Sequence, residues 1–203
     1  PDWSRGLGDV YKRQDLSSYG SEFITTPNID KMANDGVKLT SYYAAQAVCS
    51  ASRAAILTGC YPNRLGISGA FGPNSKKGIN PDELLLSEML KNNDYKTGIF
   101  GKWHLGDAEK FMPTNHGFDE FYGILFSNDM WPYHPEFPGA YPEDLLLYRN
   151  SEPVEALTDQ SDLTKNITDE SIRFIDENKD NQFFLYIAHP QPHVPLFASK
   201  EFD

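Results

Sequence analysis

The stretch Cys49-Ser50-Ala51-Ser52-Arg53-Ala54-Ala55-Ile56-Leu57-Thr58-Gly59 predicts a short helix that begins at its cysteine. The alanine-rich run favours helix, and Gly59 is a typical stop because glycine readily adopts the left-handed conformation that ends helices. Unpaired N–H groups and the positive end of the helix dipole gather at a helix start, so the position of Cys49 suits an anion. Arg53 lies one turn further on, and its planar guanidinium fits a tetrahedral oxyanion.

Plainer interpretations of this stretch exist. A Cys-x-Pro/Ala-x-Arg pattern should arise by chance in roughly one chain of this length in fifty, and a lone cysteine is usually a small buried apolar residue. A disulfide between Cys49 and Cys60 is disfavoured, because eleven helical residues would separate the two Cα atoms by about 16 Å, whereas a disulfide needs less than about 7 Å.

A second informative stretch is Gly101-Lys102-Trp103-His104-Leu105-Gly106, which follows an apolar run at 95–100 that we interpret as a strand. In extended backbone, Lys102 and His104 point to one face and Trp103 to the other, so two polar groups can enter a site while the indole packs. Taken alone, such a Lys-x-His pair would more often be a feature of the surface.

Two further stretches come later in the chain. The apolar run at 183–188 predicts a buried strand, and His189 and His193 follow it, where ligand sites of α/β sheets lie. The sequence Ser127-Asn128-Asp129 also carries polar groups, although a turn explains such a cluster nearly as well.

In this order, the stretches resemble the signatures of the formylglycine-dependent sulfatase family, in particular its arylsulfatase A and N-acetylgalactosamine-6-sulfatase group, over residues 15–203. The resemblance implies that a maturing enzyme oxidises Cys49 to formylglycine, whose hydrate attacks the sulfur of a sulfate ester. The roles that it implies for the other catalytic residues are charge neutralisation by Arg53 and Lys102, deprotonation of the second hydroxyl by His104, and protonation of the leaving alcohol by His193. Lys102, Ser127 and His193 would contact the substrate, whereas His189 does not match the pattern and is expected to be a supporting or loop residue.

The resemblance also implies a divalent metal, Ca²⁺ with Mg²⁺ as the alternative, bound in part by Cys49 in its formylglycine form. The other ligands are expected before Asp15 and beyond Asp203. Residues 1–14 include Asp9-Val10-Tyr11-Lys12-Arg13-Gln14, which matches a translated sequencing adaptor, so we treat them as non-native. We therefore expect 15–203 to be part of an N-terminal catalytic domain, and the 203-residue chain to be inactive by itself.

Composition limits the remaining possibilities. The chain is 39% hydrophobic with a net charge of −11, and no uninterrupted apolar stretch approaches the ~20 residues that a membrane span needs. The negative charge disfavours nucleic acid as a partner. The expected partners are a small-molecule or glycan sulfate ester and the formylglycine-generating enzyme. By resemblance, the location is expected to be periplasmic or secreted, with the signal peptide in the missing N-terminal region.

The pattern of apolar residues predicts an α/β fold with a mostly parallel sheet and helices on both faces. The resemblance implies the alkaline-phosphatase-like version, incomplete at both ends. Helices are expected at 26–34, 80–92 and 162–178, strands at 37–43, 95–100 and 183–188, and an irregular insertion at about 131–161. The last helix should bury Leu163, Ile167, Phe174 and Ile175.

Three other functions remain open. A phosphodiesterase or phosphonate hydrolase of the same superfamily can use the same nucleophile. A thiol enzyme would use unmodified Cys49, but no histidine stands in a recognisable thiolate-pairing context in the sequence. The third alternative is an inactive truncated product.

Overall fold

The computed structural model describes residues 15–202, and the expected non-native segment 1–14 lies outside them. A five-stranded sheet in the order β4-β3-β2-β1-β5 forms the centre. Its strands are β1 (Lys96–Lys102), β2 (Glu120–Ile124), β3 (Leu146–Arg149), β4 (Glu152–Ala156) and β5 (Phe183–Ala188). Strand β1 pairs in parallel with both β2 and β5, while β3 and β4 extend the sheet with antiparallel pairing. The sheet is therefore mixed, and its parallel part carries the segments expected to form the site.

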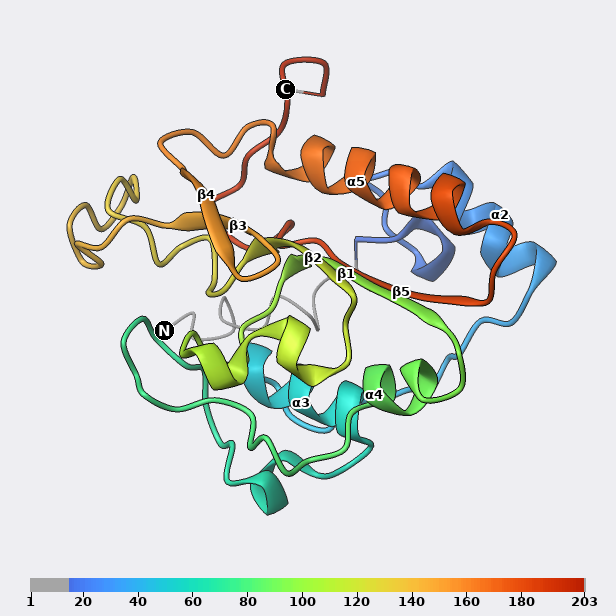
Figure 1. Ribbon diagram of the computed structural model, residues 1–203. Coiled ribbons are helices and arrows are strands. Elements are labelled where there is room, and N and C mark those ends of the chain that lie inside the picture. The colour runs from blue at the N-terminus through green and yellow to red at the C-terminus, as the bar shows by residue number, and fades with distance from the viewer. Residues whose placement is uncertain (1–14, 203) are drawn as a thin grey trace.

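Helices cover both faces of the sheet, as predicted (Figure 1). Helix α5 lies along one face, and α3 and α4 lie on the other. The helices are α2 (Pro27–Asp35), α3 (Cys49–Thr58), α4 (Leu86–Lys91) and α5 (Leu163–Asn178).

The core is divided into two apolar clusters by the sheet. Along β1, Ile99 belongs to the cluster shared with α3, and the next residue, Phe100, belongs to the cluster under α5. Both residues are completely buried, because alternate side chains of a central strand point to opposite faces and both faces are covered. This explains why two consecutive residues of β1, Ile99 and Phe100, are both large and apolar.

Gly101 lets the parallel strands stay in contact at the point where β1 ends. Its φ of +123° is one that residues with a side chain rarely adopt, and a Cβ there would overlap the carbonyl group of Ala188 on β5. Glycine is therefore required immediately before Lys102.

Helix α5 follows the prediction with one correction. Leu163, Ile167 and Phe174 are buried, but Ile175 is 38% exposed. Residues 174 and 175 lie about 100° apart around a helix, so they cannot both point at the sheet. Ser171 takes the fourth inward position, and its hydroxyl donates to the carbonyl of Ile167.

The prediction of a strand at 37–43 is wrong, because no strand forms there. Val37 and Tyr43 are each 84% exposed. β-Branched and aromatic residues favour a strand only where a neighbouring strand and an apolar face receive them, and these residues have neither within the described part of the chain.

Two other boundaries are also corrected. The helix expected at 80–92 begins only at Leu86, because Glu88 accepts a hydrogen bond from the N–H of Leu85 and fixes the helix start there. The insertion expected to be irregular at 131–161 contains the hairpin of β3 and β4, so regular strands and helices are lacking only before it, at 131–145, and after it, at 157–161. No helix within residues 15–202 combines the length and apolar character needed to cross a membrane.

Candidate active site

Cys49 is the first residue of α3, as predicted. It follows Val48 in extended conformation, and α3 ends at Gly59 with φ of +69°. The cysteine is only 6% exposed, and neither it nor the exposed Cys60 is in a disulfide. The structure therefore places Cys49 where the amide groups of a helix start converge.

Arg53, Lys102 and Ser127 come together from three different segments. The Nη1 atom of Arg53 donates to the backbone carbonyl of Lys102, at the end of β1. Lys102 in turn donates from Nζ to the hydroxyl of Ser127, at 2.9 Å. Each of the three residues is 2% exposed, so Lys102 is not a surface residue and Ser127 is not merely part of an exposed turn.

His104 is completely buried and has a defined tautomer. Its Nε2 atom lies 2.7 Å from the carbonyl oxygen of Phe71, which can only accept, so Nε2 carries the proton. Among residues 15–202, Nδ1 has no hydrogen-bond partner. Burial, reinforced by the positive charge of Lys102, holds the pKa of His104 well below its usual value. The imidazole is therefore neutral at pH 7, with an available lone pair on Nδ1.

Trp103 packs into the core, but the extended backbone expected over 102–104 is not continued, because β1 ends at Lys102 and His104 has a left-handed φ of +60°. The indole is 1% exposed and donates from Nε1 to the carbonyl of Phe111. It packs against the rings of His116 and Phe118. This packing fixes the backbone that carries Lys102 and His104.

His193 is buried in the loop after β5 and has the opposite tautomeric arrangement. Its Nδ1 atom lies 2.7 Å from the carbonyl of Val194 and donates to it, which leaves Nε2 for other interactions. The same Nδ1 lies 4.0 Å from Oδ1 of Asp129, an ion pair when the imidazole is protonated. Asp129 Oδ1 is buried and has no hydrogen-bond partner in the described part of the chain.

Asn128 connects the two halves of this arrangement, a role that the sequence analysis missed. It is completely buried, and its Nδ2 atom donates to the carbonyls of His193 and Pro195, at 3.3 and 3.1 Å. Asn128 thereby holds the His193 loop beside Ser127. The sequence indicates a polar triplet at 127–129, but its pattern assigns a role only to the serine.

A cavity of about 450 Å³ joins several of these groups. The predicted site residues that line it are Cys49, His104, Ser127 and His193, and Asp129 lines it as well. His189 is half-buried and is not a lining residue. No histidine near Cys49 in the sequence indicates a partner for it, but the fold brings His104 and His193 into its cavity.

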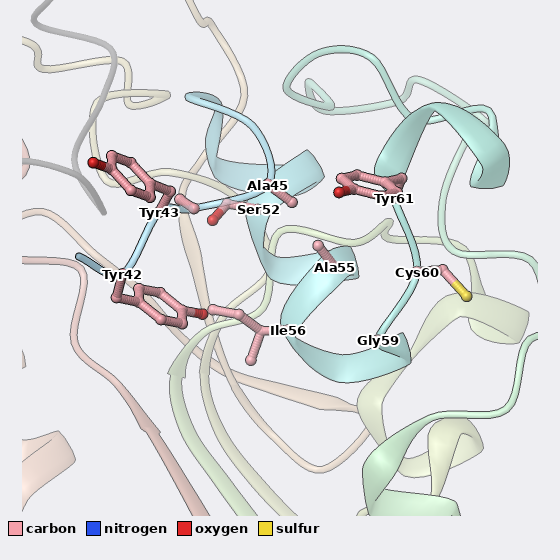
Figure 2. Close-up of a pocket in the computed structure, with 10 residues that line it drawn as sticks. Tyr42, Tyr43, Ala45, Ser52, Ala55, Ile56, Gly59, Cys60 and Tyr61 are labelled. Atoms are coloured by element: carbon pink, nitrogen blue, oxygen red, sulfur yellow. The ribbon is translucent and has the colours of Figure 1, made fainter. Parts of the chain in front are cut away.

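A different hollow, of about 250 Å³, lies on the outer side of α3 (Figure 2). Tyr42, Tyr43 and Tyr61 surround it, together with residues of α3 and Cys60. None of the six predicted site residues lines this hollow. The polar groups that could act on an anion therefore gather on the inner side of α3.

The residues that the structure describes do not by themselves form a metal site. No group of three His, Cys, Asp or Glu side chains within 15–202 could hold an ion together. Ca²⁺ takes six to eight oxygen ligands, so the described residues do not fit a complete calcium site.

Comparison with known proteins agrees with this geometry. The profile of the Sulfatase family matches residues 7–203. An arylsulfatase of Hemicentrotus pulcherrimus is 39% identical over 93% of the chain, and the N-acetylgalactosamine-6-sulfatase of Homo sapiens is 37% identical over 93%. The chain spans only 36% and 38% of the lengths of these two relatives.

The chain is also similar in structure to solved proteins. The crystal structure of Ps i-CgsB in complex with k-i-k-neocarrahexaose superposes with a TM-score of 0.81 at 33% identity, covering 97% of this chain and 45% of that one. A phosphonate monoester hydrolase of Agrobacterium radiobacter, at 20% identity and a TM-score of 0.58, shares the fold. The family profile covers nearly the whole chain, and the chain belongs to the sulfatase family.

Proposed function

We propose that this chain carries the nucleophile part of a sulfatase active site, in which Cys49 is oxidised to formylglycine and the protein hydrolyses a sulfate ester. The observation that carries the proposal is the cavity beside the start of α3, which Cys49, His104, Ser127 and His193 line together. A hydrated formylglycine at 49 supplies two hydroxyl groups on one carbon, one of which attacks sulfur.

Arg53, Lys102 and Ser127 provide positive charge and hydrogen bonds beside the nucleophile. The guanidinium of Arg53 is held by the carbonyl of Lys102, and the ammonium of Lys102 is held by Ser127. These groups are buried, and charge in a water-poor site is more effective at stabilising negative oxygens than it is in water. They would offset the charge that develops on the sulfate oxygens.

The two histidines have distinct roles that follow from their tautomers. His193 keeps Nδ1 on a carbonyl and has Asp129 as a counter-charge, so Nε2 of its protonated form can donate to the departing alcohol oxygen. His104 is neutral, with its lone pair on Nδ1. It would accept the proton of the second hydroxyl at 49, which expels sulfate and restores the aldehyde.

The family implies a divalent metal in addition to formylglycine. We propose Ca²⁺, with Mg²⁺ as the alternative, in the protein at its natural full length. Of the described residues, position 49 in its modified form would contribute one oxygen ligand. Removal of metal by a chelator should abolish turnover, and re-addition of Ca²⁺ should restore it.

The names of similar proteins support a sulfated sugar as the substrate class. One is an N-acetylgalactosamine-6-sulfatase, and another was crystallised with k-i-k-neocarrahexaose. A formylglycine-generating enzyme is the partner that the modification requires.

The proposal is tested by expressing the chain with a formylglycine-generating system and determining the mass of the peptide that contains residue 49. We expect the aldehyde or its hydrate at 49. The Cys49→Ala and Cys49→Ser variants have no thiol at 49, so they set the baseline of the assay. Unmodified thiol at 49, in a host that converts a known sulfatase, would contradict the proposal.

Paired kinetics then separate the two hydrolase classes. The full-length protein should have a higher kcat/KM for an aryl sulfate than for the matching phosphate monoester, phosphodiester or phosphonate ester. The reverse preference would identify a phosphoryl or phosphonyl hydrolase of the same fold.

A further inference from the structure

A second cavity of about 590 Å³ opens beside the one that contains Cys49. Asp129 and His193 line both cavities, so the two meet at the residue that we place beside the leaving alcohol. The remaining walls come mainly from the segment 134–141, which precedes β3. The alcohol half of a sulfate ester bound at Cys49 would extend past His193 into this second cavity.

His134 presents a single, oriented hydrogen-bond donor in this cavity. Its Nδ1 atom accepts the backbone N–H groups of Glu136 and Phe137, at 3.1 and 3.2 Å. The proton of the neutral ring must then be on Nε2. Within residues 15–202, Nε2 has no hydrogen-bond partner, although the residue is only 8% exposed. The imidazole is held by its own turn and by the ring of Phe137, 5.3 Å away.

The other walls supply aromatic surface and acceptors. Phe137 and Tyr141 line the cavity, and Phe137 is 61% exposed. Aromatic faces suit the C–H faces of a ring-shaped alcohol, because they are apolar and carry partial negative charge. Glu136 and Asp129 contribute carboxylates, and carboxylates accept hydrogen bonds from hydroxyl groups but repel anions.

We propose that His134 is a specificity-determining residue for the proposed reaction: it donates to a hydroxyl group of an uncharged sugar ring that occupies this second cavity as the alcohol half of the substrate. The inference rests on the proposed function, since it assigns a substrate contact and the charge of the substrate at the same site. The combination of one fixed donor, two carboxylate acceptors and aromatic faces fits a polyol ring. The two carboxylates disfavour a sugar with a second sulfate or a carboxylate on the same ring.

The test compares two kinds of sulfate ester in the full-length protein. Galactose 6-sulfate is the neutral sugar probe, and 4-nitrophenyl sulfate is the control, since it carries no hydroxyl groups. In His134→Asn, the shorter amide can still accept from the turn but cannot reach the ring hydroxyl. We expect kcat/KM for the sugar sulfate to fall about 10-fold, mainly through KM, with the aryl sulfate changed less than about twofold.

A charge variant and a neighbouring control sharpen the comparison. Glu136→Gln should improve turnover of galactose with a second sulfate relative to the singly sulfated sugar, while Tyr133→Phe, outside the cavity lining, should change neither ratio. Equal loss on the sugar and aryl sulfates in His134→Asn, no loss on the sugar sulfate, or a wild-type preference for the doubly sulfated sugar would overturn the inference.

A binding measurement keeps the inference separate from the proposed function. Saturation-transfer NMR should detect galactose bound to the wild-type protein, and the signal should weaken in His134→Asn. Sugar binding without hydrolysis of any sulfate ester would support the cavity assignment and contradict the proposed function. Hydrolysis of aryl sulfate without detectable sugar binding would contradict the cavity assignment alone.

Discussion

The two neighbouring cavities differ in how their walls are built. The inner cavity, which contains Cys49, is formed by the start of a helix and by segments that leave adjacent parallel strands, and Ser127 in its wall holds the buried ammonium group of Lys102. The outer cavity is formed largely by the segment 134–141, which contains no helix or strand. A rigid frame fixes reacting groups to fractions of an ångström, whereas a surface segment can change without disturbing the sheet. We therefore expect the chemistry to take place in the inner cavity and the choice of substrate to be made in the outer one.

The largest effect should come from the inner cavity. Lys102→Met keeps an apolar stem of similar length and removes the ammonium group, so we expect kcat for both aryl and sugar sulfates to fall by about 10²-fold or more. The measurement is steady-state kinetics of the full-length protein on both substrates. A loss confined to the sugar sulfate would contradict the division between the cavities.

His193 lines both cavities, and we expect its substitution to impair catalysis as substitutions at the inner cavity do. His193→Asn removes the group that we propose protonates the alcohol, and we expect kcat to fall by about 10²-fold. The loss should be smaller for 4-nitrophenyl sulfate than for a sugar sulfate, because a phenol with a low pKa leaves without much assistance. His189→Asn is the matched control. If that variant were inactive and His193→Asn retained wild-type activity, the roles of the two histidines would be reversed.

Ser127→Ala should have a smaller effect on the same assay. The variant removes the hydroxyl that accepts from Lys102 but leaves the ammonium charge in place, so we expect a loss of about 10-fold or less in kcat/KM. The double variant with Lys102→Met should be no worse than Lys102→Met alone, since the serine acts on the substrate together with that lysine. Additive losses would indicate that the two residues contribute independently.

The smallest effect concerns the folding stability of the protein rather than catalysis. His116 is completely buried against Trp103, and burial lowers its pKa below the usual 6.5. Below about pH 6.5 the unfolded chain binds a proton that the folded chain does not, so folding stability decreases as pH falls. In His116→Phe, the drop in Tm between about pH 7.5 and about pH 5.5 should be smaller than in wild type.

Thermal unfolding followed by circular dichroism measures this difference. Ser87→Ala is the control, because it removes a hydrogen bond to the carbonyl of His116 without removing a titratable group. If Tm decreased by the same amount in His116→Phe and in wild type on acidification, His116 would not be responsible for the loss of folding stability at low pH.

Local patterns predicted well those parts whose causes are local. Helix α3 begins at Cys49 and ends before Gly59 because helix formers, a helix start and a left-handed glycine are all encoded within eleven residues. Strand β5 has the predicted bounds, since a continuous apolar run between polar segments predicts a strand, but it lies at the edge of the described sheet and is only partly buried. The order of the polar segments also predicted which strand ends carry the site.

Other parts depended on partners that sequence pattern does not specify. The stretch at 37–43 has strand-forming residues but no neighbouring strand within the described residues, so it remains exposed. The hairpin of β3 and β4 formed within a segment whose proline, tyrosine and acidic residues suggested irregular structure, because pairing with β2 stabilises it. Strand formation is thus decided by distant contacts more than by propensity.

The sequence by itself determined the family, the start of the nucleophile helix and the candidate residues Cys49, Arg53, Lys102, His104 and His193, because these lie in short motifs with fixed spacing. Only the tertiary structure decided how their atoms are used. The tautomers of His104 and His193 depend on carbonyls that accept from them, and the neutral state of His104 depends on burial beside Lys102. The link from Asn128 to the His193 loop joins residues 65 positions apart. Such contacts are set by how the chain folds back on itself, which no local pattern of residues contains.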